Sequence, residues 1–499
     1  MIHCCHFKIN MRRFLILLLC AGFVPGIFVS VLAEPQTLTL DKTVELARDN
    51  APAAKQAENR YLSDYWNHRM YKADYRPSID LNATLPNFNR SISGVIQPDG
   101  SEEFRERNIL RNTLGFTLNQ RIPFTGGDIF LNTDLERLDN YEPFEETEYR
   151  STPVTIGIRQ PISRFNRFSW ERKIQPLRYE EARRNYRESI EQVHIEAVNT
   201  FFDAYLAQIN LDIAETNEAN NDTLYQIAQG RYELGRIAEN ELLQMELSML
   251  NSQNTLSEAE LNYQNRLFDL KNLLDIDESA EIELDMQHET PDVEVEVDEA
   301  VQYAKNNRTN PVSYERQVLE AERNLEEARS QRFDIDLFAL YGLSNQSLTP
   351  EGAYRNPGDQ QRVQVGIQMP ILDWGRNKAQ REIAGSEKQL IEIEIEQQRE
   401  EFENEVAMHV RRFRMNKNNL EIAARADTVA QRRFEVARER YLIGNIAITD
   451  LNIAMNEQDR ARQSYIEALR SYWNSYYNLR RLTLYDFEDD QALELPRQP

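Results

Sequence analysis

Apolar residues recur along one stretch of the chain at the spacing of a long helix with one buried side. Residues 172–234 contain glycine only at Gly230 and proline only at Pro176, which predicts a helix of about 62 residues, roughly 93 Å long at 1.5 Å per residue. The apolar positions follow in steps of four, four and three: Ala182, Tyr186, Ile190, Val193, Ala197, Phe201 and Ala204. This eleven-residue period keeps the apolar line straight or slightly right-handed, so it predicts a helix packed beside its neighbours in a buried bundle or a large cylinder.

A second stretch repeats this pattern and ends at the same kind of turn. Both stretches end in the sequence Arg-Tyr-x-x-Gly, at 231–235 and 440–444, and glycine after the last helical turn is a typical stop. A helix returns after each glycine, to about residues 274 and 482. We therefore expect two antiparallel helical hairpins with tips at Gly235 and Gly444. The apolar positions of the second stretch, interrupted once by Arg399, are Ile391, Ile395, Phe402, Val406, Val410 and Phe413.

Four shorter segments alternate apolar and polar residues with the period of two that is typical of strands. Such strands have one apolar and one polar face, which fits either the half-buried sheet of a soluble protein or a membrane barrel with lipid outside and water inside. Taken alone, the strands favour the soluble sheet. The apolar positions are Ile79, Leu81 and Ala83; Val154, Ile156 and Ile158; Leu337, Ala339 and Tyr341; and Val363, Val365, Ile367 and Met369.

The chain consists of two copies of one unit. At an offset of 209 positions, the stretch 157–273 aligns with the second copy without a gap, and its glycine, proline and tyrosine positions match as well as its apolar ones. Upstream the offset is 257 to 259 positions, so the first copy carries 50 additional residues between Leu81 and Gly157. These matches predict a first repeat at 34–290, a second repeat at 291–484 and a polar tail at 485–499.

Each repeat is expected to contain a helix, strands and a hairpin. In the first, the strands lie at about 77–162 and the hairpin at about 166–274; in the second, they lie at about 335–371 and 374–482. The additional segment, about 84–150, also alternates, around Phe116 before Pro123 and around Leu131 after it. It predicts either a further hairpin, giving six strands per chain, or an outward-facing loop structure. We slightly favour a hairpin that begins in the sheet and extends beyond it.

Residues 1–33 have the pattern of a secretory signal peptide. Arg12 and Arg13 precede an apolar stretch at 14–32, and Ala33 ends a small-residue cleavage site. Met11 is the better start, because residues 1–10 add nothing to an export signal, and a retained membrane anchor is the alternative. The cleaved chain has no thiol and no disulfide, because all three cysteines lie in this segment: Cys4, Cys5 and Cys20.

The charge and composition of the chain exclude several classes of protein. The formal net charge is −24, and it becomes −27 when the basic residues of the signal peptide are removed, so binding to phosphate-rich nucleic acid is disfavoured. Hydrophobic residues make up 41% and aromatic residues 9%, which disfavours disorder. An acidic exported chain without disulfides needs a large core or an assembly to hold it together.

No catalytic pattern is present, so we expect neither an enzyme nor a cofactor. The sequence contains no His-Glu-x-x-His, no Gly-x-Ser-x-Gly and no glycine-rich phosphate loop. We expect no metal site, because the histidines that follow the signal peptide are widely separated: His68, His194, His288 and His409.

Three sequence elements, in this order, resemble the TolC-like outer-membrane efflux protein family over about residues 37–484. The first is the opening Leu-Thr-Leu-Asp-Lys-Thr-Val-Glu-Leu-Ala at 38–47, and the second is Pro-Ile-Leu-Asp-Trp-Gly-Arg at 370–376. The third is the turn at 440–444 followed by Ala-Ile-Thr-Asp-Leu at 447–451. The resemblance implies a mainly α fold with β structure, internally duplicated, whose long antiparallel helical hairpins form a trimeric α-barrel and whose strands contribute to a shared transmembrane β-barrel.

The resemblance also implies a function and partners. It implies a homotrimer in the outer membrane that extends into the periplasm and conducts substrates passively, with outer-membrane lipid, a periplasmic adaptor (membrane fusion) protein and an inner-membrane pump as partners. A separate argument agrees: four strands cannot close a barrel, because single-chain barrels begin at about eight strands and open edges are prohibitive in lipid. Three copies of four strands give twelve. The alternatives are the exit duct of a type I protein secretion system and a periplasmic coiled-coil scaffold.

The resemblance implies three groups of functional residues. The hairpin tips become candidate adaptor contacts, although the two glycines are also ordinary helix stops: Tyr232, Leu234, Gly235, Arg236, Tyr441, Ile443, Gly444 and Asn445. A candidate junction between strands and helices comprises Pro161, Pro370, Asp373 and Gly375, where Asp373 can cap the following helix.

The third group is a candidate periplasmic gate. The family gate uses a tyrosine, an arginine and two aspartates; Tyr441 and Asp450 match, whereas Ile446 and Ile453 replace the arginine and the second aspartate. We hypothesise that Asp450, repeated three times about an axis and joined by Glu241, forms an acidic ring that attracts cations. The simpler interpretation is a solvated helix face.

Overall fold

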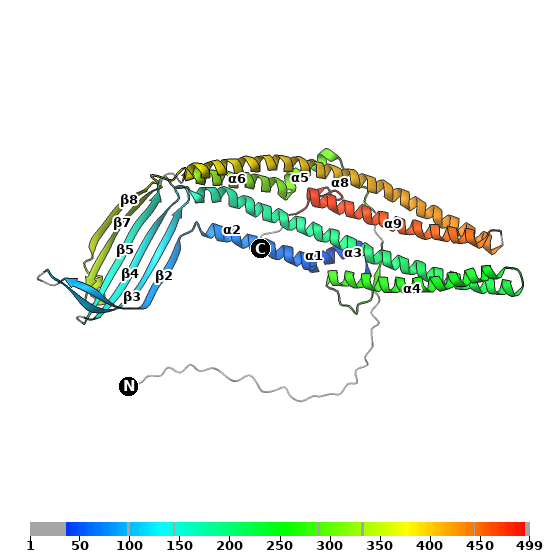
Figure 1. Ribbon diagram of the computed structural model, residues 1–499, viewed down its shortest axis with the longest axis horizontal. Coiled ribbons are helices and arrows are strands. Elements are labelled where there is room, and N and C mark those ends of the chain that lie inside the picture. Colours follow the sequence, from blue (N-terminus) through cyan, green and yellow to red (C-terminus); the bar gives the residue numbers. More distant parts are fainter. Residues whose placement is uncertain are drawn as a thin grey trace, which may run out of the picture.

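A computed structural model of the chain describes residues 36–96, 100–142, 145–286, 290–330, 334–443 and 445–494. The predicted signal peptide, His288, Gly444 and the last five residues of the tail lie outside these residues. The described chain is elongated, with one sheet at one end and the tips of two helical hairpins at the other (Figure 1).

The two repeats have matching helices, which confirms the duplication. Two short helices open each repeat, and in both repeats they are 11 and 22 residues long: α1 (Leu40–Asn50) and α2 (Pro52–Ala73), then α5 (Val297–Asn307) and α6 (Thr309–Ser330). The long hairpins consist of helices of 67 and 36 residues in both repeats: α3 (Arg167–Glu233) with α4 (Glu239–Leu274), and α8 (Arg376–Leu442) with α9 (Ile448–Thr483). Corresponding bounds of the long hairpins are related by the same offset as the two sequence copies.

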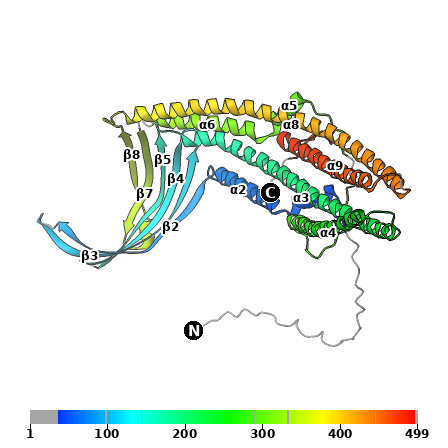
Figure 2. The ribbon, with the colours of Figure 1, turned by 45° about the vertical axis from the view of Figure 1, so that its right-hand side comes forward.

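Six antiparallel strands form the sheet, in the order β2-β3-β4-β5-β7-β8. The additional residues of the first repeat form β3 and β4, which lie within this sheet between β2 and β5. The hairpin of β2 and β3 continues beyond the end of β4, and Figure 2 shows it projecting past the other strands. The bounds are β2 (Ser78–Ile96), β3 (Glu102–Ile122), β4 (Gly127–Glu142), β5 (Glu146–Pro161), β7 (Asp334–Ser347) and β8 (Gly358–Gln368).

One face of this sheet is apolar across all six strands. Leu118 of β3 lies opposite Ile79 of β2 and Leu131 of β4, and the same row continues through Ile156 of β5 to Tyr341 of β7. The neighbouring row runs from Ile129 of β4 through Ile158 and Ala339 to Val363 of β8, which is 74% exposed. The helices lie end-on to the sheet and not against this face (Figure 1). The expectation of a half-buried sheet in a soluble protein is therefore wrong, because no helix of the described chain covers the apolar face. Alternation of apolar and polar residues does not show what covers such a face.

The main core lies in the middle of the helical part, where both repeats meet. It contains the later positions of both predicted eleven-residue patterns: Ala197, Phe201 and Ala204 of α3 are fully buried, as are Val406 and Val410 of α8. Two pairs of short strands lie in the helical part: β1 (Gln36–Leu38) is parallel to β6 (Ile282–Leu284), and β9 (Tyr485–Asp486) pairs with β10 (Gln491–Ala492). The short helix α7 (Pro350–Ala353) follows β7 in the sheet. Among the described residues, no helix is both long enough and apolar enough to cross a membrane.

Candidate functional site

The helices lie side by side in an order that leaves the same two edges open at every level. Towards the tips, α3 packs against α4 and α9, and α9 packs against α8, so the order is α4-α3-α9-α8. Nearer the sheet the order is α2-α3-α6-α8. The sheet begins at β2 and ends at β8. The described chain therefore has one edge made of β2, α2 and α4, and another made of β8 and α8, on opposite sides of the molecule (Figure 1).

The α8 edge carries an exposed apolar stripe, which we call the α8 stripe. Its members recur every seven residues and are between 41% and 71% exposed: Met408, Met415, Ile422, Val429, Val436 and Ile443. A strict seven-residue repeat faces a partner helix in a left-handed coiled coil. Within the described chain this side of α8 faces no other helix, so the stripe needs a partner from outside the chain.

The opposite edge carries a matching stripe on α4, the α4 stripe. Its members are between 46% and 61% exposed and fit the a and d positions of one heptad pattern: Leu243, Leu247, Leu250, Leu261 and Phe268. The sequence interpretation missed both stripes, because it followed the buried eleven-residue period and not the seven-residue period on the other side of the helices. Counting residues along each helix would have found them.

The two stripes lie at the same height above the tips. At about 1.5 Å per residue, Ile422 lies about 30 Å from the end of α8 at Leu442, and Leu261 lies about 33 Å from the start of α4 at Glu239. Met415 and Phe268 lie about 41 Å and about 44 Å from those same ends. Because both hairpins have helices of equal length, the α8 stripe of one chain would meet the α4 stripe of another if the tips were level.

The hairpin tips are exposed, and a cation–π contact joins them. Gly235 has a φ of +67°, a left-handed conformation that favours glycine, and its N–H donates to the carbonyl of Tyr232 at 2.8 Å. Leu234 and Ile443 are 72% and 71% exposed. The guanidinium carbon of Arg231 lies 5.9 Å from the ring centroid of Tyr441, so the two tips of one chain are in contact. The sequence did not reveal this contact. The tips present apolar side chains to solvent, as a protein-binding surface would.

The predicted gate residues lie just behind the tips, on the returning helices. Asp450 is exposed in the first turn of α9, and Glu241 is exposed in the first turn of α4. Carboxylates in a first turn stabilise a helix through its dipole. The structure does not bring the two carboxylates into contact within one chain, and neither forms an ion pair with another described residue. Their gate role stays a prediction about an assembly.

The junction between strands and helices is built by the predicted Asp373. Its carboxylate accepts hydrogen bonds from the N–H groups of Gly375 at 3.0 Å and Asn377 at 3.1 Å, and these bonds lower the pKa of Asp373. Gly375 has a φ of +84° and is the N-cap residue of α8, Pro161 is the last residue of β5, and Pro370 follows the end of β8. The chain thus turns from each strand into a long helix at equivalent places.

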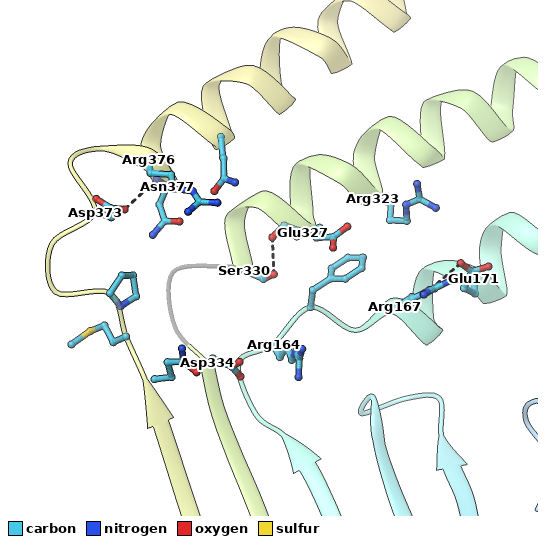
Figure 3. A pocket seen from close by; sticks show the side chains of 15 residues that line it. Arg164, Arg167, Glu171, Arg323, Glu327, Ser330, Asp334, Asp373, Arg376 and Asn377 are labelled. Atoms are coloured by element: carbon cyan, nitrogen blue, oxygen red, sulfur yellow. Dashed lines mark hydrogen bonds and ion pairs between the residues drawn. The ribbon is translucent and has the colours of Figure 1, made fainter.

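A cavity of about 980 Å³ lies at this junction, between the first turns of α3 and α8 and the end of α6 (Figure 3). Its lining is rich in charge of both signs. The basic members are Arg164, Arg167, Arg323 and Arg376, and the acidic members are Glu171, Glu327, Asp334 and Asp373. Arg167 forms an ion pair with Glu171 at 3.5 Å. Since the charges balance and most of these side chains reach solvent, the cavity is a polar, solvent-open part of the junction.

A buried charged cluster ties the two repeats together below the junction. Arg480 of α9 contacts Glu191 of α3 at 3.3 Å and Asp486 of β9 at 2.8 Å, and His194 lies 3.3 Å from Glu191. Burial would raise the pKa of Glu191, but the hydrogen bond with His194 and the charge of Arg480 outweigh it and lower that pKa. The Tyr476 hydroxyl donates to Asp486 at 3.0 Å. The ion pairs of this cluster hold α3 and α9 together, although Glu191 Oε2, His194 Nδ1 and Arg480 Nε are buried without a well-aligned hydrogen bond.

Within the part of the chain that the structure describes, no group of three histidine, cysteine or acidic side chains is placed to hold a metal ion. His68 is stacked on Tyr179 at 4.4 Å, and burial lowers its pKa. Burial also lowers the pKa of His409.

Comparison with known proteins points to one family. A family model described as outer membrane efflux protein matches residues 43–275 and 334–483. The Campylobacter jejuni CmeC outer membrane channel is 16% identical, with 91% of this chain and 87% of that chain covered at a TM-score of 0.65. The outer membrane protein VceC from Vibrio cholerae is 13% identical, with 89% and 95% covered at a TM-score of 0.62. The open state of the Neisseria gonorrhoeae MtrE outer membrane channel is 13% identical, with 89% and 88% covered at a TM-score of 0.60. No curated protein sequence matches the chain.

Proposed function

Because the chain belongs to the outer membrane efflux protein family, we propose that it is the outer-membrane channel of a tripartite efflux system and that three copies form one conduit. The conduit passively conducts substrates from a periplasmic adaptor and an inner-membrane pump to the exterior. The pump supplies the energy, because the sequence contains no nucleotide-binding motif.

The observation that carries this proposal is that the chain is unfinished along two matching edges. At the sheet, β2 and β8 each have one side without a partner strand among the described residues, and unpaired strand edges are not tolerated in lipid. At the helices, the α4 and α8 stripes are apolar and exposed at the same height. A second copy of this chain supplies the missing partner at both levels, β8 for β2 and the α8 stripe for the α4 stripe.

The seam formed in this way buries apolar surface that favours assembly. Burying an apolar side chain of this size completely contributes about 1.5–3 kcal/mol, and these side chains are roughly half exposed in one chain, so each contributes about 1–2 kcal/mol. Without Ile443, which this proposal leaves exposed at the tip, the two stripes hold ten such side chains, which gives about 10–20 kcal/mol per seam before the entropy of association is subtracted. Repeated around an axis, such a seam closes a ring.

The interior of the conduit would be formed by the polar face of the sheet. Asp80, Asn82 and Thr117 lie on that face, opposite to the apolar rows of the same strands. Water-filled barrels have this arrangement, with apolar residues towards lipid and polar residues towards the lumen. The same arrangement disfavours a periplasmic coiled-coil scaffold, which would leave the apolar face in water.

The hairpin tips serve as the adaptor contact and the gate in this proposal. Leu234 and Ile443 offer exposed apolar side chains to an adaptor. Asp450 and Glu241 of three chains would converge on the axis behind the tips, where like charges attract cations.

Two measurements on the purified cleaved chain test the proposal. Native mass spectrometry in detergent should give the mass of three chains, and reconstitution into planar bilayers should give discrete conducting steps. A monomer that leaves the bilayer resistance unchanged would contradict the proposal. A chain with Ile422→Asp in the α8 stripe is the negative control, and it should give neither trimer nor conductance.

A further inference from the structure

The hairpin of β3 and β4 occupies the middle of the sheet. It separates β2 from β5, so the 50 additional residues raise the sheet of one chain from four strands to six. An extracellular loop would attach at the end of the strands and leave β2 paired directly with β5. The position of this hairpin makes it part of the wall.

Both inserted strands carry the two faces that a membrane wall needs. Phe116 and Leu118 of β3 and Leu131 of β4 extend the apolar rows of the neighbouring strands on the same side. Thr117 of β3 and Asn132 of β4 pair with each other and continue the polar side. Each inserted strand therefore matches lipid on one side and water on the other.

The turn between the inserted strands is fastened to the helices beneath it. The side-chain amide of Asn166 donates to the carbonyls of Pro123 at 3.1 Å and Phe124 at 3.0 Å, and the guanidinium of Arg172 lies 4.6 Å from the ring centre of Phe124. On the other side, Arg121 forms an ion pair with Asp74, just after α2, at 3.1 Å. The turn is thus held between the end of α2 and the start of α3, directly below the wall.

The width of six strands fits the width of the four helices below them. Strands about 4.8 Å apart and tilted by about 40° each occupy about 6.3 Å of circumference, so six strands span about 38 Å and four span about 25 Å. Four helices packed 8–10 Å apart span about 32–40 Å. With the inserted hairpin, the strands and the helices of one chain therefore have about the same width.

We infer that the inserted hairpin widens the exit pore, so that three chains close a barrel of eighteen strands as wide as the helical tunnel. The inference rests on the proposed trimer. Eighteen strands give a backbone diameter of about 36 Å, against about 24 Å for twelve. Side chains remove about 5 Å from each wall, which leaves a free width of about 26 Å against about 14 Å.

This width sets the class of cargo that the membrane pore admits. One α-helix with its side chains is about 10–12 Å wide, so a pore of about 14 Å passes a single helix or a slender solute. A pore of about 26 Å also passes a polymer or macrocycle twice as wide. The size limit of the conduit then lies at the hairpin tips and not in the membrane.

A deletion of the inserted hairpin tests the inference. Replacing residues 90–145 by Asn-Gly joins β2 directly to β5 and keeps Ile79 level with Ile156 on the apolar side, which gives four strands per chain. The matched control replaces residues 91–107 by Asn-Gly, which removes the same projecting part of β2 but keeps six strands. Both variants and the wild type are reconstituted in planar bilayers, and poly(ethylene glycol) of graded size is added on the extracellular side.

The wild type and the control should admit polymers up to a radius of about 13 Å, and the deletion should lower this limit to about 7 Å, roughly twofold. Equal limits in all three proteins would overturn the inference. If the deletion variant does not fold, the wild-type trimer is imaged by electron cryomicroscopy, where a wall of eighteen strands supports the inference and a wall of twelve overturns it. A native mass other than that of three chains would overturn the proposed function itself.

Discussion

The seam between chains can be broken by placing charge in the α8 stripe. Ile422 and Val429 are 59% and 61% exposed in the single chain, so covering them contributes about 1–2 kcal/mol each. Over three seams, the double change Ile422→Asp with Val429→Asp removes about 6–12 kcal/mol of apolar burial. It also leaves two carboxylates per seam facing the α4 stripe, and burying an unpaired carboxylate costs several kcal/mol more. At about 1.4 kcal/mol for each factor of ten, the assembly constant should fall by at least about seven powers of ten.

Native mass spectrometry and sedimentation of the purified double variant measure this effect. We expect a folded monomer with unchanged helix content, because neither side chain belongs to the core of the single chain. Thr428→Asp is the matched control: Thr428 is exposed, adjacent to Val429 in sequence and about a third of a turn away from the stripe, so this variant should remain a trimer. A double variant that still forms trimers at micromolar concentration would refute the proposed seam.

Three further predictions concern single residues. Asp450→Asn should weaken block of the channel by divalent cations and reduce its preference for cations, because it removes three charges from the proposed ring; single-channel currents with and without Mg²⁺ that match the wild type would rule out the ring. Arg480→Gln should lower the free energy of unfolding by about 3–5 kcal/mol, because it leaves the buried Glu191 carboxylate without its cation. The pKa of Glu191 is lowered in the folded chain, so the ionised carboxylate stabilises the fold above its ordinary pKa near 4.5, and this stabilisation is lost as the pH falls through the lowered pKa. Denaturant titrations should therefore show that acid lowers the free energy of unfolding less in Arg480→Gln than in the wild type. Asn166→Ala should lower the free energy of unfolding by about 1–2 kcal/mol, because the Asn166 side chain caps α3 by accepting from Ser169 N–H at 3.2 Å and also holds the turn between β3 and β4. In thermal melts, the control Asn185→Ala, on the exposed side of α3, should lower it by less than half as much.

The duplicated architecture could be predicted because the residues that end its helices and strands act locally. The glycines and prolines that end helices and strands act through backbone conformation, so the offset between the two sequence copies carries over directly to the bounds of α3 and α8. The alternation around Phe116 likewise predicts a strand, whatever its position in the sheet.

The surroundings of these elements could not be predicted from the same patterns. Alternation at Val363 shows that one face is apolar, but it does not show whether helices or lipid cover that face. The contact of Arg231 with Tyr441 and the pairing of Arg480 with Glu191 join residues that are far apart in the sequence, and nothing local marks either pair. The α8 stripe has a local pattern, but its seven-residue period lies on the same helix as the buried eleven-residue period, and only the packing separates the two.

Cross-linking of cysteines placed on the two edges tests the closed ring of three chains most directly. The described chain contains no cysteine, so Leu261→Cys and Ile422→Cys together give each molecule one thiol on each edge. Oxidation of this double variant in outer membranes should produce dimers and trimers and then stop at three chains, because a ring has no free edge, whereas either single variant should stay monomeric on a denaturing gel. Absence of cross-links, or a ladder that continues beyond three chains, would contradict a trimeric channel.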